Sequence, residues 1–379
     1  MKNGIVVLLV NLHLLTVDAQ SLIESWTFDT GDKVLASPVV DDTFIYVGSQ
    51  NGNFYSLNAK DGSFHWKYET SGIIQAAALL TERLVFFESA NIFYALDKME
   101  GKLVWKFDTG MTPLNFEYEG VTHSYKIDFW DDKRSVGVAD GNLIYVGSGN
   151  GTLYVFDQAS GIVVKQYQSD DNSPIRSTPL IDGNIVYFGD WNGVVYAYNR
   201  ESDELKWKKK TYRYDRPYPS FGGVVSSFVR HNDLLLFGAR NHIMNVLYAE
   251  TGEKEWTYID PKGGWMVGDP VVYNDTLYIG GSDNLSMYAF RPKWGRYLWQ
   301  HNGGLNIYTR PIVTDQHIIY SAGNGYKWTD PGAVYVLNRM TGEEITKFET
   351  PNAVFSSPIK LNDQIIFGCY DGKVYSLEL

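Results

Sequence analysis

One order of hydrophobic and polar positions recurs eight times along the chain. Each copy has an aromatic residue, a hydrophobic residue two positions later, a polar residue, a tight turn and, in most copies, a Trp. The first copy consists of Tyr55, Leu57, Asn58, the turn at 61–62 and Trp66. The other copies begin at Tyr94, Tyr154, Tyr196, Tyr248, Tyr288, Tyr335 and Tyr375. Repeats of about 40–45 residues with four short strands each are typical of a β-propeller, so the pattern predicts eight blades.

The first and last copies are incomplete in complementary ways. The copy at Tyr375 stops at the C-terminus without a Trp, whereas residues 24–31 contain Trp26 and resemble the segment that follows every other copy. A ring of blades exposes a sheet edge unless its ends are joined, and an N-terminal strand added to the last blade removes that edge. We therefore predict an all-β fold over residues 21–379. It is a single eight-bladed β-propeller of four-stranded antiparallel blades, with the N-terminal strand closing the last blade.

Each blade is expected to start with a short inner strand. These strands are predicted at residues 37–40, 76–79, 177–180, 226–229, 268–271, 309–312 and 356–359. The turns that follow them, and the turns between the third and fourth strands, are short and rich in Asp, Asn and Gly. In an up-and-down blade both sets of turns lie on one face, which we call the smooth face.

The irregular segments fall on the opposite face, which we call the loop face. It is predicted to carry residues 110–134, 212–223, 240–242, 263–266, 303–308 and 323–332. Elaborated loops on one side of a rigid scaffold are where binding sites are usually built. We therefore expect the functional site on the loop face.

Composition supports the strand pattern and disfavours several classes of function. Aromatic residues make up 15% of the chain and Gly contributes 36 of 379 residues, which suits short strands joined by turns. A net charge of −11 disfavours nucleic-acid binding, and the basic run at 206–210 is expected on a solvated outer strand. The single cysteine, Cys369, excludes an intramolecular disulfide and a cysteine-type metal cluster, and no metal site is predicted.

Residues 1–20 are predicted to be a secretory signal peptide. Lys2 precedes an apolar run from Ile5 to Val17, and cleavage is expected near Ala19 or Gln20. The run is too short to be a membrane span, and no Cys at its end provides a lipid anchor. The mature chain is therefore expected to be secreted or periplasmic, without a membrane span.

The repeated Tyr-x-Leu-Asp, Thr-Gly and Trp elements resemble the pyrroloquinoline-quinone-type propeller repeat, and the resemblance covers residues 24–379. Proteins with this repeat include quinoprotein alcohol dehydrogenases and the scaffold lipoprotein of the outer-membrane barrel-assembly machinery. The resemblance implies the propeller fold, but unrelated activities share it, so it leaves the function open.

The two relatives differ in how well they match the chain. The dehydrogenases resembled have an adjacent Cys pair, calcium ligands of the Glu, Asn and Asp type, and a longer chain, whereas this chain has only Cys369. Neither a quinone nor another cofactor is therefore expected. The scaffold interpretation keeps the chain length and blade number but lacks the lipid-anchor Cys, and it implies a protein partner.

Basic and aromatic residues gather in the loop-face segments of this acidic chain. The candidate catalytic residues are His123, Tyr125, Lys126, Tyr214 and Tyr218. The candidate substrate-binding residues are Arg134, Arg176, Arg216, Arg240, His242, Trp265, Tyr308, Arg310 and Lys327. Guanidinium groups beside aromatic faces suit an anionic ligand with a flat or ring-shaped apolar surface, such as a uronate-containing oligosaccharide.

Elimination from a uronate needs a cation that holds the carboxylate, a base and an acid. Arg134, Arg176 or Arg216 is assigned the first role, His123 or Lys126 the second, and one of the loop tyrosines the third. The sequence thus favours a secreted carbohydrate-active protein, either a polysaccharide lyase or a sugar-acid dehydratase. The alternatives are a noncatalytic scaffold or binding propeller, with the same Arg and Tyr residues tying blades together or contacting a ligand, and, less favoured, a quinoprotein dehydrogenase.

Overall fold

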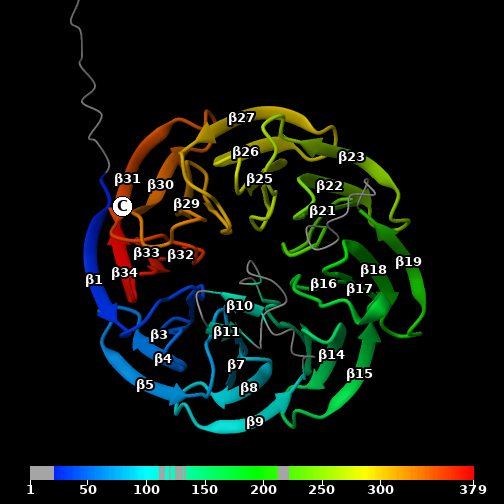
Figure 1. Ribbon diagram of the computed structural model, residues 1–379, viewed down its shortest axis with the longest axis horizontal. Coiled ribbons are helices and arrows are strands. Elements are labelled where there is room, and N and C mark those ends of the chain that lie inside the picture. Colours follow the sequence, from blue (N-terminus) through cyan, green and yellow to red (C-terminus); the bar gives the residue numbers. More distant parts are fainter. Residues whose placement is uncertain (1–20, 111–115, 119–120, 124–130, 132–133, 212–221) are drawn as a thin grey trace, which may run out of the picture.

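Eight four-stranded antiparallel sheets surround a central axis in the computed structural model, which describes residues 21–110, 116–118, 121–123, 131, 134–211 and 222–379 (Figure 1). The all-β, eight-bladed propeller predicted from the sequence is confirmed. Within the described residues the only other regular elements are the hairpin β10–β11 (Phe116–Tyr118 and Val121–His123) and the short 3-10 helix η1 (Asp170–Asn172).

The strands of blades 1 to 4 are numbered outward from the axis. Blade 1 contains β2 (Val39–Val40), β3 (Phe44–Gly48), β4 (Asn53–Asn58) and β5 (Phe64–Glu69). Blade 2 contains β6 (Leu79–Leu80), β7 (Leu84–Ser89), β8 (Ile92–Asp97) and β9 (Leu103–Asp108). Blade 3 contains β12 (Val138–Asp140), β13 (Leu143–Gly147), β14 (Thr152–Asp157) and β15 (Val163–Gln168). Blade 4 contains β16 (Leu180–Asp182), β17 (Ile185–Gly189), β18 (Val194–Asn199) and β19 (Leu205–Lys210).

The remaining blades follow the same order. Blade 5 contains β20 (Val229–His231), β21 (Leu234–Gly238), β22 (Ile243–Tyr248) and β23 (Lys254–Ile259). Blade 6 contains β24 (Val271–Tyr273), β25 (Thr276–Gly280), β26 (Ser286–Arg291) and β27 (Arg296–Asn302). Blade 7 contains β28 (Ile312–Val313), β29 (His317–Ala322), β30 (Gly332–Asn338) and β31 (Glu344–Thr350). Blade 8 contains β32 (Ile359–Leu361), β33 (Gln364–Gly368), β34 (Lys373–Glu378) and β1 (Ile23–Asp29).

The ring is closed by the N-terminal strand, as predicted. β1 pairs antiparallel with β34 and aligns Trp26 with Ser376 and Phe28 with Val374. Thr30 strengthens the junction, because its hydroxyl donates to the carbonyl oxygen of Gly372 at 2.9 Å. Joining the two ends of the chain in one sheet makes the ring continuous and removes the free edge that an unclosed eighth blade would expose.

The outer parts of neighbouring blades are held together by Trp residues that contact Gly residues. Trp66, Trp105, Trp207, Trp256 and Trp299 each donate the indole N–H to a carbonyl oxygen in the next blade, at 2.6–3.1 Å. Their rings lie against Gly101, Gly161, Gly252, Gly295 and Gly342, where an added Cβ would come within 2.5–2.8 Å of the ring. These repeated contacts explain why the Trp and the turn Gly recur together in the sequence.

Blade 3 has Lys165 at the position of the Trp. Its ammonium donates to the carbonyl oxygen of Arg200 in blade 4. This carbonyl is equivalent to those that accept the indole N–H groups elsewhere, so a different side chain makes the same inter-blade bond.

The inner strands are shorter than the four residues predicted, with two or three residues each. Pro38, Pro179, Pro270, Pro311 and Pro358 directly precede five of them. Proline has no N–H to donate to the sheet, which delays the start of the strand. The residues before these prolines instead leave the ladder and line the axis.

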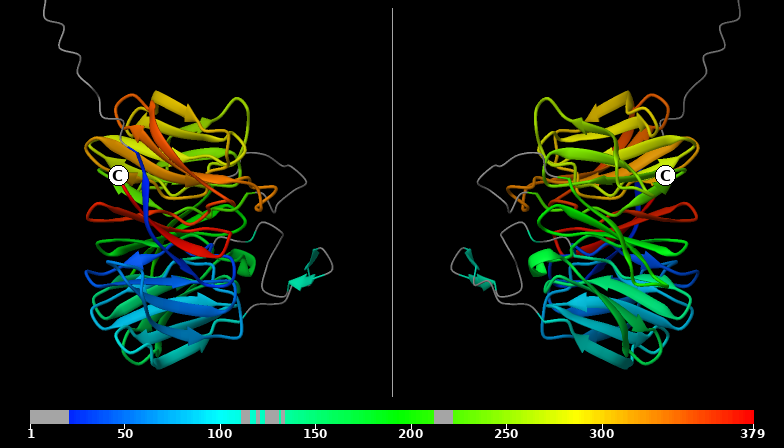
Figure 2. Two further views of the ribbon diagram at one scale, coloured as in Figure 1. Left: turned by 90° about the vertical axis from the view of Figure 1, so that its left-hand side faces the viewer. Right: turned by 90° about the vertical axis from the view of Figure 1, so that its right-hand side faces the viewer.

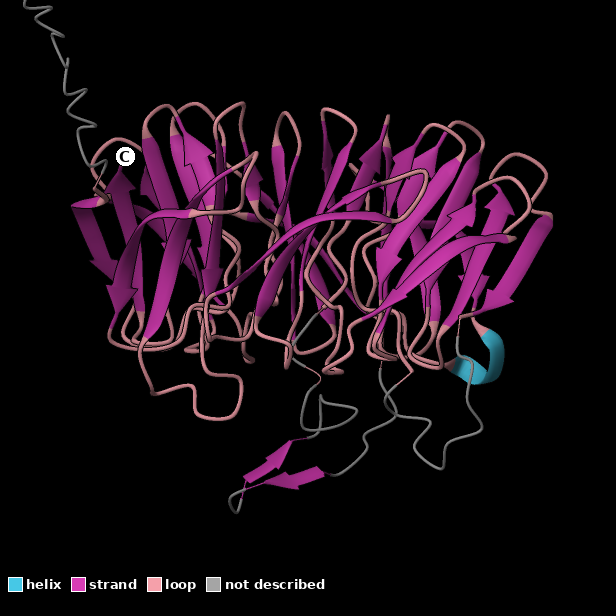
Figure 3. Cartoon of the chain, turned by 90° about the horizontal axis from the view of Figure 1, so that it is seen from above, coloured by secondary structure: helices cyan, strands magenta, loops and turns pink. Residues whose placement is uncertain are grey.

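The two faces differ as predicted. In edge-on view the smooth face carries tight turns, whereas the hairpin β10–β11 and the helix η1 extend from the opposite face (Figures 2 and 3). The connection between β29 and β30 lies on that same side. Within the described residues, no helix has the length and apolar character needed to cross a membrane.

Candidate functional site

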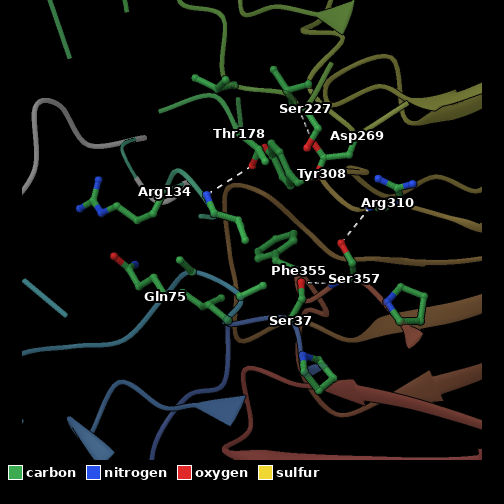
Figure 4. Close-up of a pocket in the computed structure, with 18 of the residues that line it drawn as sticks. Ser37, Gln75, Arg134, Thr178, Ser227, Asp269, Tyr308, Arg310, Phe355 and Ser357 are labelled. Carbon is green, nitrogen blue, oxygen red and sulfur yellow. Dashed lines mark hydrogen bonds between the residues drawn. The ribbon is translucent and has the colours of Figure 1, made fainter. Parts of the chain in front are cut away.

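A central cavity of about 380 Å³ lies on the propeller axis, and residues from all eight blades line it (Figure 4). Its wall is built by the segments that lead from the loop face into the inner strands. Side chains alternate along an extended segment, so every second residue points toward the axis. Two rings of equivalent positions result.

The first ring, called the pore ring, is formed by the residue two positions before each inner strand. Its members are Ser37, Ala77, Val136, Thr178, Ser227, Asp269, Arg310 and Ser357. Four of them accept a hydrogen bond from a backbone N–H of the neighbouring blade. The four bonds are Val136 to Thr178 at 3.3 Å, Ser227 to Asp269 at 2.7 Å, Arg310 to Ser357 at 2.9 Å, and Ser357 to Ser37 at 2.8 Å. The pore ring therefore links blades close to the axis.

The second ring, called the mouth ring, lies two residues earlier in each blade and closer to the loop face. Its members are Leu35, Gln75, Arg134, Arg176, Val225, Val267, Tyr308 and Phe355. Three consecutive blades, 2 to 4, contribute Gln75, Arg134 and Arg176, whereas the other five contribute apolar or aromatic residues. The mouth ring thus has a polar half and an apolar half, and Figure 4 shows Gln75 and Arg134 of the first apart from Tyr308 and Phe355 of the second.

The charges of the polar half are bound within the protein. Asp131 is fully buried and accepts two hydrogen bonds from Arg176, both at 3.0 Å, while Arg134 approaches it to 2.6 Å. Glu88 lies 3.8 Å from Arg134. Burial alone would raise the pKa of Asp131, but the two guanidinium groups outweigh it and lower the pKa to about 2. The carboxylate therefore stays ionised and fixes both arginines.

The cavity wall also contains an arginine, outside the mouth ring, that is stacked between two tryptophans. The guanidinium carbon of Arg240 lies 4.3 Å from the ring centre of Trp191 and 4.4 Å from that of Trp265. Arg240 is 2% exposed and still contributes to the cavity wall. Contact with two indoles holds the guanidinium group in place.

Aromatic side chains continue around the apolar half from blade 7 to blade 8. Tyr308 meets Phe355 edge to face at a ring distance of 5.1 Å, and Phe355 meets Trp328 at 5.5 Å. Trp328 in turn contacts Tyr370 at 5.3 Å. Perpendicular contacts of this kind hold the rings in place, so the wall presents rigid apolar surface to the cavity.

The charged residues that line the cavity, among those the structure describes, are Arg134, Arg240, Asp269 and Arg310. Three cations and one anion give the wall a positive excess, although the whole chain carries −11. Arg310 differs from the other two arginines because its side chain is exposed.

Most of the candidate catalytic residues lie outside the part of the chain that the structure describes. Tyr125, Lys126, Tyr214 and Tyr218 lie outside the described residues, as does Arg216. His123 ends strand β11, and only its backbone placement is described. Their assignment stays a prediction.

Five of the candidate binding residues line the cavity, namely Arg134, Arg240, Trp265, Tyr308 and Arg310. Three others do not appear in its wall. Arg176 is buried against Asp131, His242 is exposed and accepts the N–H of Gly264 at 2.9 Å, and Lys327 is exposed and pairs with Asp330 at 2.6 Å. A ligand in the cavity would therefore contact the first group and not the second.

Several residues of the cavity wall were not predicted from the sequence, above all Trp191, Trp328, Phe355, Asp269 and Gln75. A signal for three of them was present in the spacing. Phe355 and Gln75 stand four residues before the inner strands, and Asp269 stands two residues before, as the pore and mouth rings require. Trp191 follows the last Gly of β17 by two residues, as Arg240 follows that of β21.

Cofactor and metal chemistry find little support in the described part of the chain. No group of three or more His, Cys, Asp or Glu side chains there has the arrangement needed to hold a metal ion. Cys369 is fully buried, and burial raises the pKa of its thiol to about 12. A quinone site with an adjacent Cys pair does not fit a chain with one cysteine.

Comparison with known sequences gives one family and several partial relatives. The family described as outer membrane protein assembly factor BamB matches residues 13–126, 128–256 and 192–345. The BamB of Kangiella koreensis is 24% identical over 178 residues, which cover 44% of this chain and 43% of that protein. The human beta-alanine-activating enzyme is 30% identical over 104 residues, which cover 26% of this chain and 9% of that enzyme. The chain thus spans less than half the length of both curated relatives.

A solved structure supports the fold alone. A europium-containing methanol dehydrogenase superposes with a TM-score of 0.74 at 13% sequence identity, covering 94% of this chain and 93% of that one. Similar proteins therefore include an assembly factor and enzymes, and none of these matches favours a lyase.

Proposed function

Because the chain belongs to the family of the outer membrane protein assembly factor BamB, whose repeat is of the pyrroloquinoline-quinone type, we propose that it is a noncatalytic binding propeller. Its loop face and central cavity hold a segment of a partner protein. The observation that carries this proposal is the apolar side of the cavity, where Tyr308 and Phe355 of the mouth ring, together with Trp265, border a volume of about 380 Å³.

The chemistry of the wall supports binding more than catalysis. Tyr308 and Asp269 are the described lining residues that could transfer a proton, and both already make hydrogen bonds, to Ser282 at 3.2 Å and Ser227 at 2.7 Å. Apolar pockets with a few fixed polar groups are typical of recognition sites. Rigid aromatic side chains also provide much contact area at a low cost in conformational entropy.

Location follows from the same proposal. An assembly factor for outer-membrane proteins acts outside the cytoplasm, so we propose that residues 1–20 direct export and that residues 21–379 form the mature propeller. Residues 1–20 lie outside the described structure.

Co-purification tests the proposal. The tagged mature chain is expected to retain a partner protein that is lost when Tyr308 is replaced by Ala. The matched control is Trp294→Ala, because Trp294 is 71% exposed in the turn between β26 and β27 on the smooth face. Loss of the partner in the Trp294 variant, with retention in the Tyr308 variant, would contradict a loop-face site.

A second candidate is a carbohydrate-active enzyme that acts on uronate-containing oligosaccharides by elimination or dehydration. The observation that favours it is the hairpin ending at His123, which extends from the loop face of the propeller (Figure 3). Incubating the protein with such oligosaccharides tests it by ultraviolet absorbance and product mass. Chain cleavage with new absorbance from unsaturated uronates indicates a lyase, and loss of one water without cleavage indicates a dehydratase. No change with any substrate removes both.

A further inference from the structure

We propose that Arg310 is the residue with which the cavity recognises a carboxylate on its ligand, so that the bound segment is an apolar peptide ending in, or carrying, an acidic group. This inference rests on the proposed binding function and adds the chemistry of the ligand. It places the acidic group beside blade 7 and the apolar side chains against the apolar half of the mouth ring.

The first argument comes from the structural role of the pore ring. Ser37, Thr178, Asp269 and Ser357 each use a side-chain oxygen to accept a backbone N–H from the neighbouring blade. Arginine has five donors and no acceptor, so Arg310 cannot make this kind of bond. Holding blades together therefore does not explain why an arginine occupies this position.

The second argument is the state of its guanidinium. The backbone N–H of Arg310 donates to Ser357 at 2.9 Å. Its side chain makes no hydrogen bond or ion pair with any residue of the described structure, and it is exposed in the cavity wall (Figure 4). By contrast, Arg134 is paired with Asp131 and Arg240 is stacked between two indoles. Arg310 is thus the exposed arginine of the wall, and its donors are available to a ligand.

The third argument concerns the charge and shape of the surroundings. Arg240 contributes to the same wall and adds to the positive potential, in a chain whose net charge is −11. Cavity walls of low dielectric constant strengthen such fields. Tyr308, two residues before Arg310, lines the same cavity, so one extended ligand can contact both groups. Guanidinium groups also match the planar geometry of carboxylates.

A matched pair of peptides tests the inference. The probes are an acetylated peptide of two phenylalanines with a free carboxylate and the same peptide as its amide, with binding followed by calorimetry and by tryptophan fluorescence. The native protein is expected to bind the acid about tenfold or more tightly than the amide, because hydrogen bonds to charged groups contribute more than those to neutral ones. Arg310→Gln is expected to abolish that preference and Arg310→Lys to retain part of it.

The control variant is Arg296→Gln. Arg296 is exposed at the start of outer strand β27, so replacing it with Gln removes the same charge without changing a residue of the cavity wall. Its preference for the acid is expected to equal that of the native protein. Equal reduction in both variants would mean that net charge alone is responsible, and this overturns the assignment of Arg310.

Failure of the inference is distinguishable from failure of the proposed function. Equal binding of acid and amide to the native protein overturns the role of Arg310 but leaves a peptide-binding cavity. Absence of binding by either peptide overturns both. Trigalacturonate serves as a third probe. If the native protein binds it, Arg310→Gln does not, and neither peptide binds, the cavity is an anion site for sugars. This result would overturn the peptide proposal.

Discussion

The polar and apolar halves of the mouth ring use the same backbone positions for opposite purposes. In blades 3 and 4 the position holds arginines, and their charges are bound to the buried Asp131. In blades 7 and 8 it holds Tyr308 and Phe355, whose rings line the cavity. A basic residue near a central cavity is therefore not evidence for an anion site until its ion-pair partners within the protein are known. The comparison also shows which half is available to a ligand.

The largest effect is expected from removing Asp131, which is the fully buried anion among the described residues of the polar half. Asp131→Ala leaves Arg134 and Arg176 buried beside each other with only the half-buried Glu88, 3.8 Å from Arg134, as a counter-ion, and such a loss typically costs about 3–5 kcal/mol. Chemical unfolding measures it. The control Glu69→Gln breaks an exposed pair with Lys67 and is expected to leave the unfolding curve unchanged. Unchanged stability in the Asp131 variant would show that the ion pairs do not hold this half together.

Acid provides a second test of the polar half. The pKa of Asp131 is about 2 in the folded protein and is expected near its ordinary value of 3.8 in the unfolded chain. Because the folded pKa is the lower of the two, the ionised carboxylate stabilises the folded protein at pH values above the unfolded pKa. This stabilisation is lost as the pH falls from about 4 to 2. The expected loss is about 2 kcal/mol. Unfolding curves of the native protein and of Asp131→Asn should diverge less at pH 2 than at pH 5, and a constant difference would contradict the assignment.

The apolar side of the cavity is tested by removing one of its stacked rings. Trp265→Ala takes away one of the two indoles that sandwich Arg240, an interaction of about 1–2 kcal/mol in a partly desolvated site. Thermal unfolding should show this modest loss, and peptide binding should fall by a larger factor than stability. An equally large aromatic residue outside the cavity, Trp294, serves as the control. A binding loss shared by Trp294→Ala would mean that the cavity is not the site.

The smallest expected effect distinguishes the ring of Tyr308 from its hydroxyl. Tyr308→Phe removes the hydroxyl that lies 3.2 Å from the Ser282 hydroxyl but keeps the aromatic surface. Stability is expected to fall by about 0.5–1.5 kcal/mol, and peptide affinity to stay within twofold. Calorimetry measures both quantities. A large loss of affinity would assign a direct ligand contact to the hydroxyl.

Most of the fold was predictable because the same contacts between neighbouring blades recur in each sequence repeat. Trp66 and Gly101 recur together since the indole packs on the Gly of the next blade, and Trp26 marks the strand that completes blade 8. The smooth face and the loop face followed from turn lengths. The length of the inner strands did not, because the prolines that precede five of them delay the start of the ladder.

The site was predictable only in part. The sequence pointed to Arg240, Trp265, Tyr308 and Arg310, which line the cavity. It could not separate them from Arg176, because the partner of Arg176 is Asp131, 45 residues away in sequence and in a different connection. Ion pairs between distant segments depend on the folded arrangement, and a single sequence carries no local sign of them.

The most direct test of the central claim is photo-crosslinking from two aromatic positions of matched exposure. Tyr326 is 72% exposed in the β29–β30 connection on the loop face, and Trp294 is 71% exposed on the smooth face. Each is replaced in turn by a photoreactive benzoylphenylalanine, and the adducts formed in the native host are identified by mass. The account predicts a protein adduct from position 326 that disappears when Tyr308→Ala is added, with none from position 294. Adducts from position 294 alone, or oligosaccharide adducts from position 326, would contradict it.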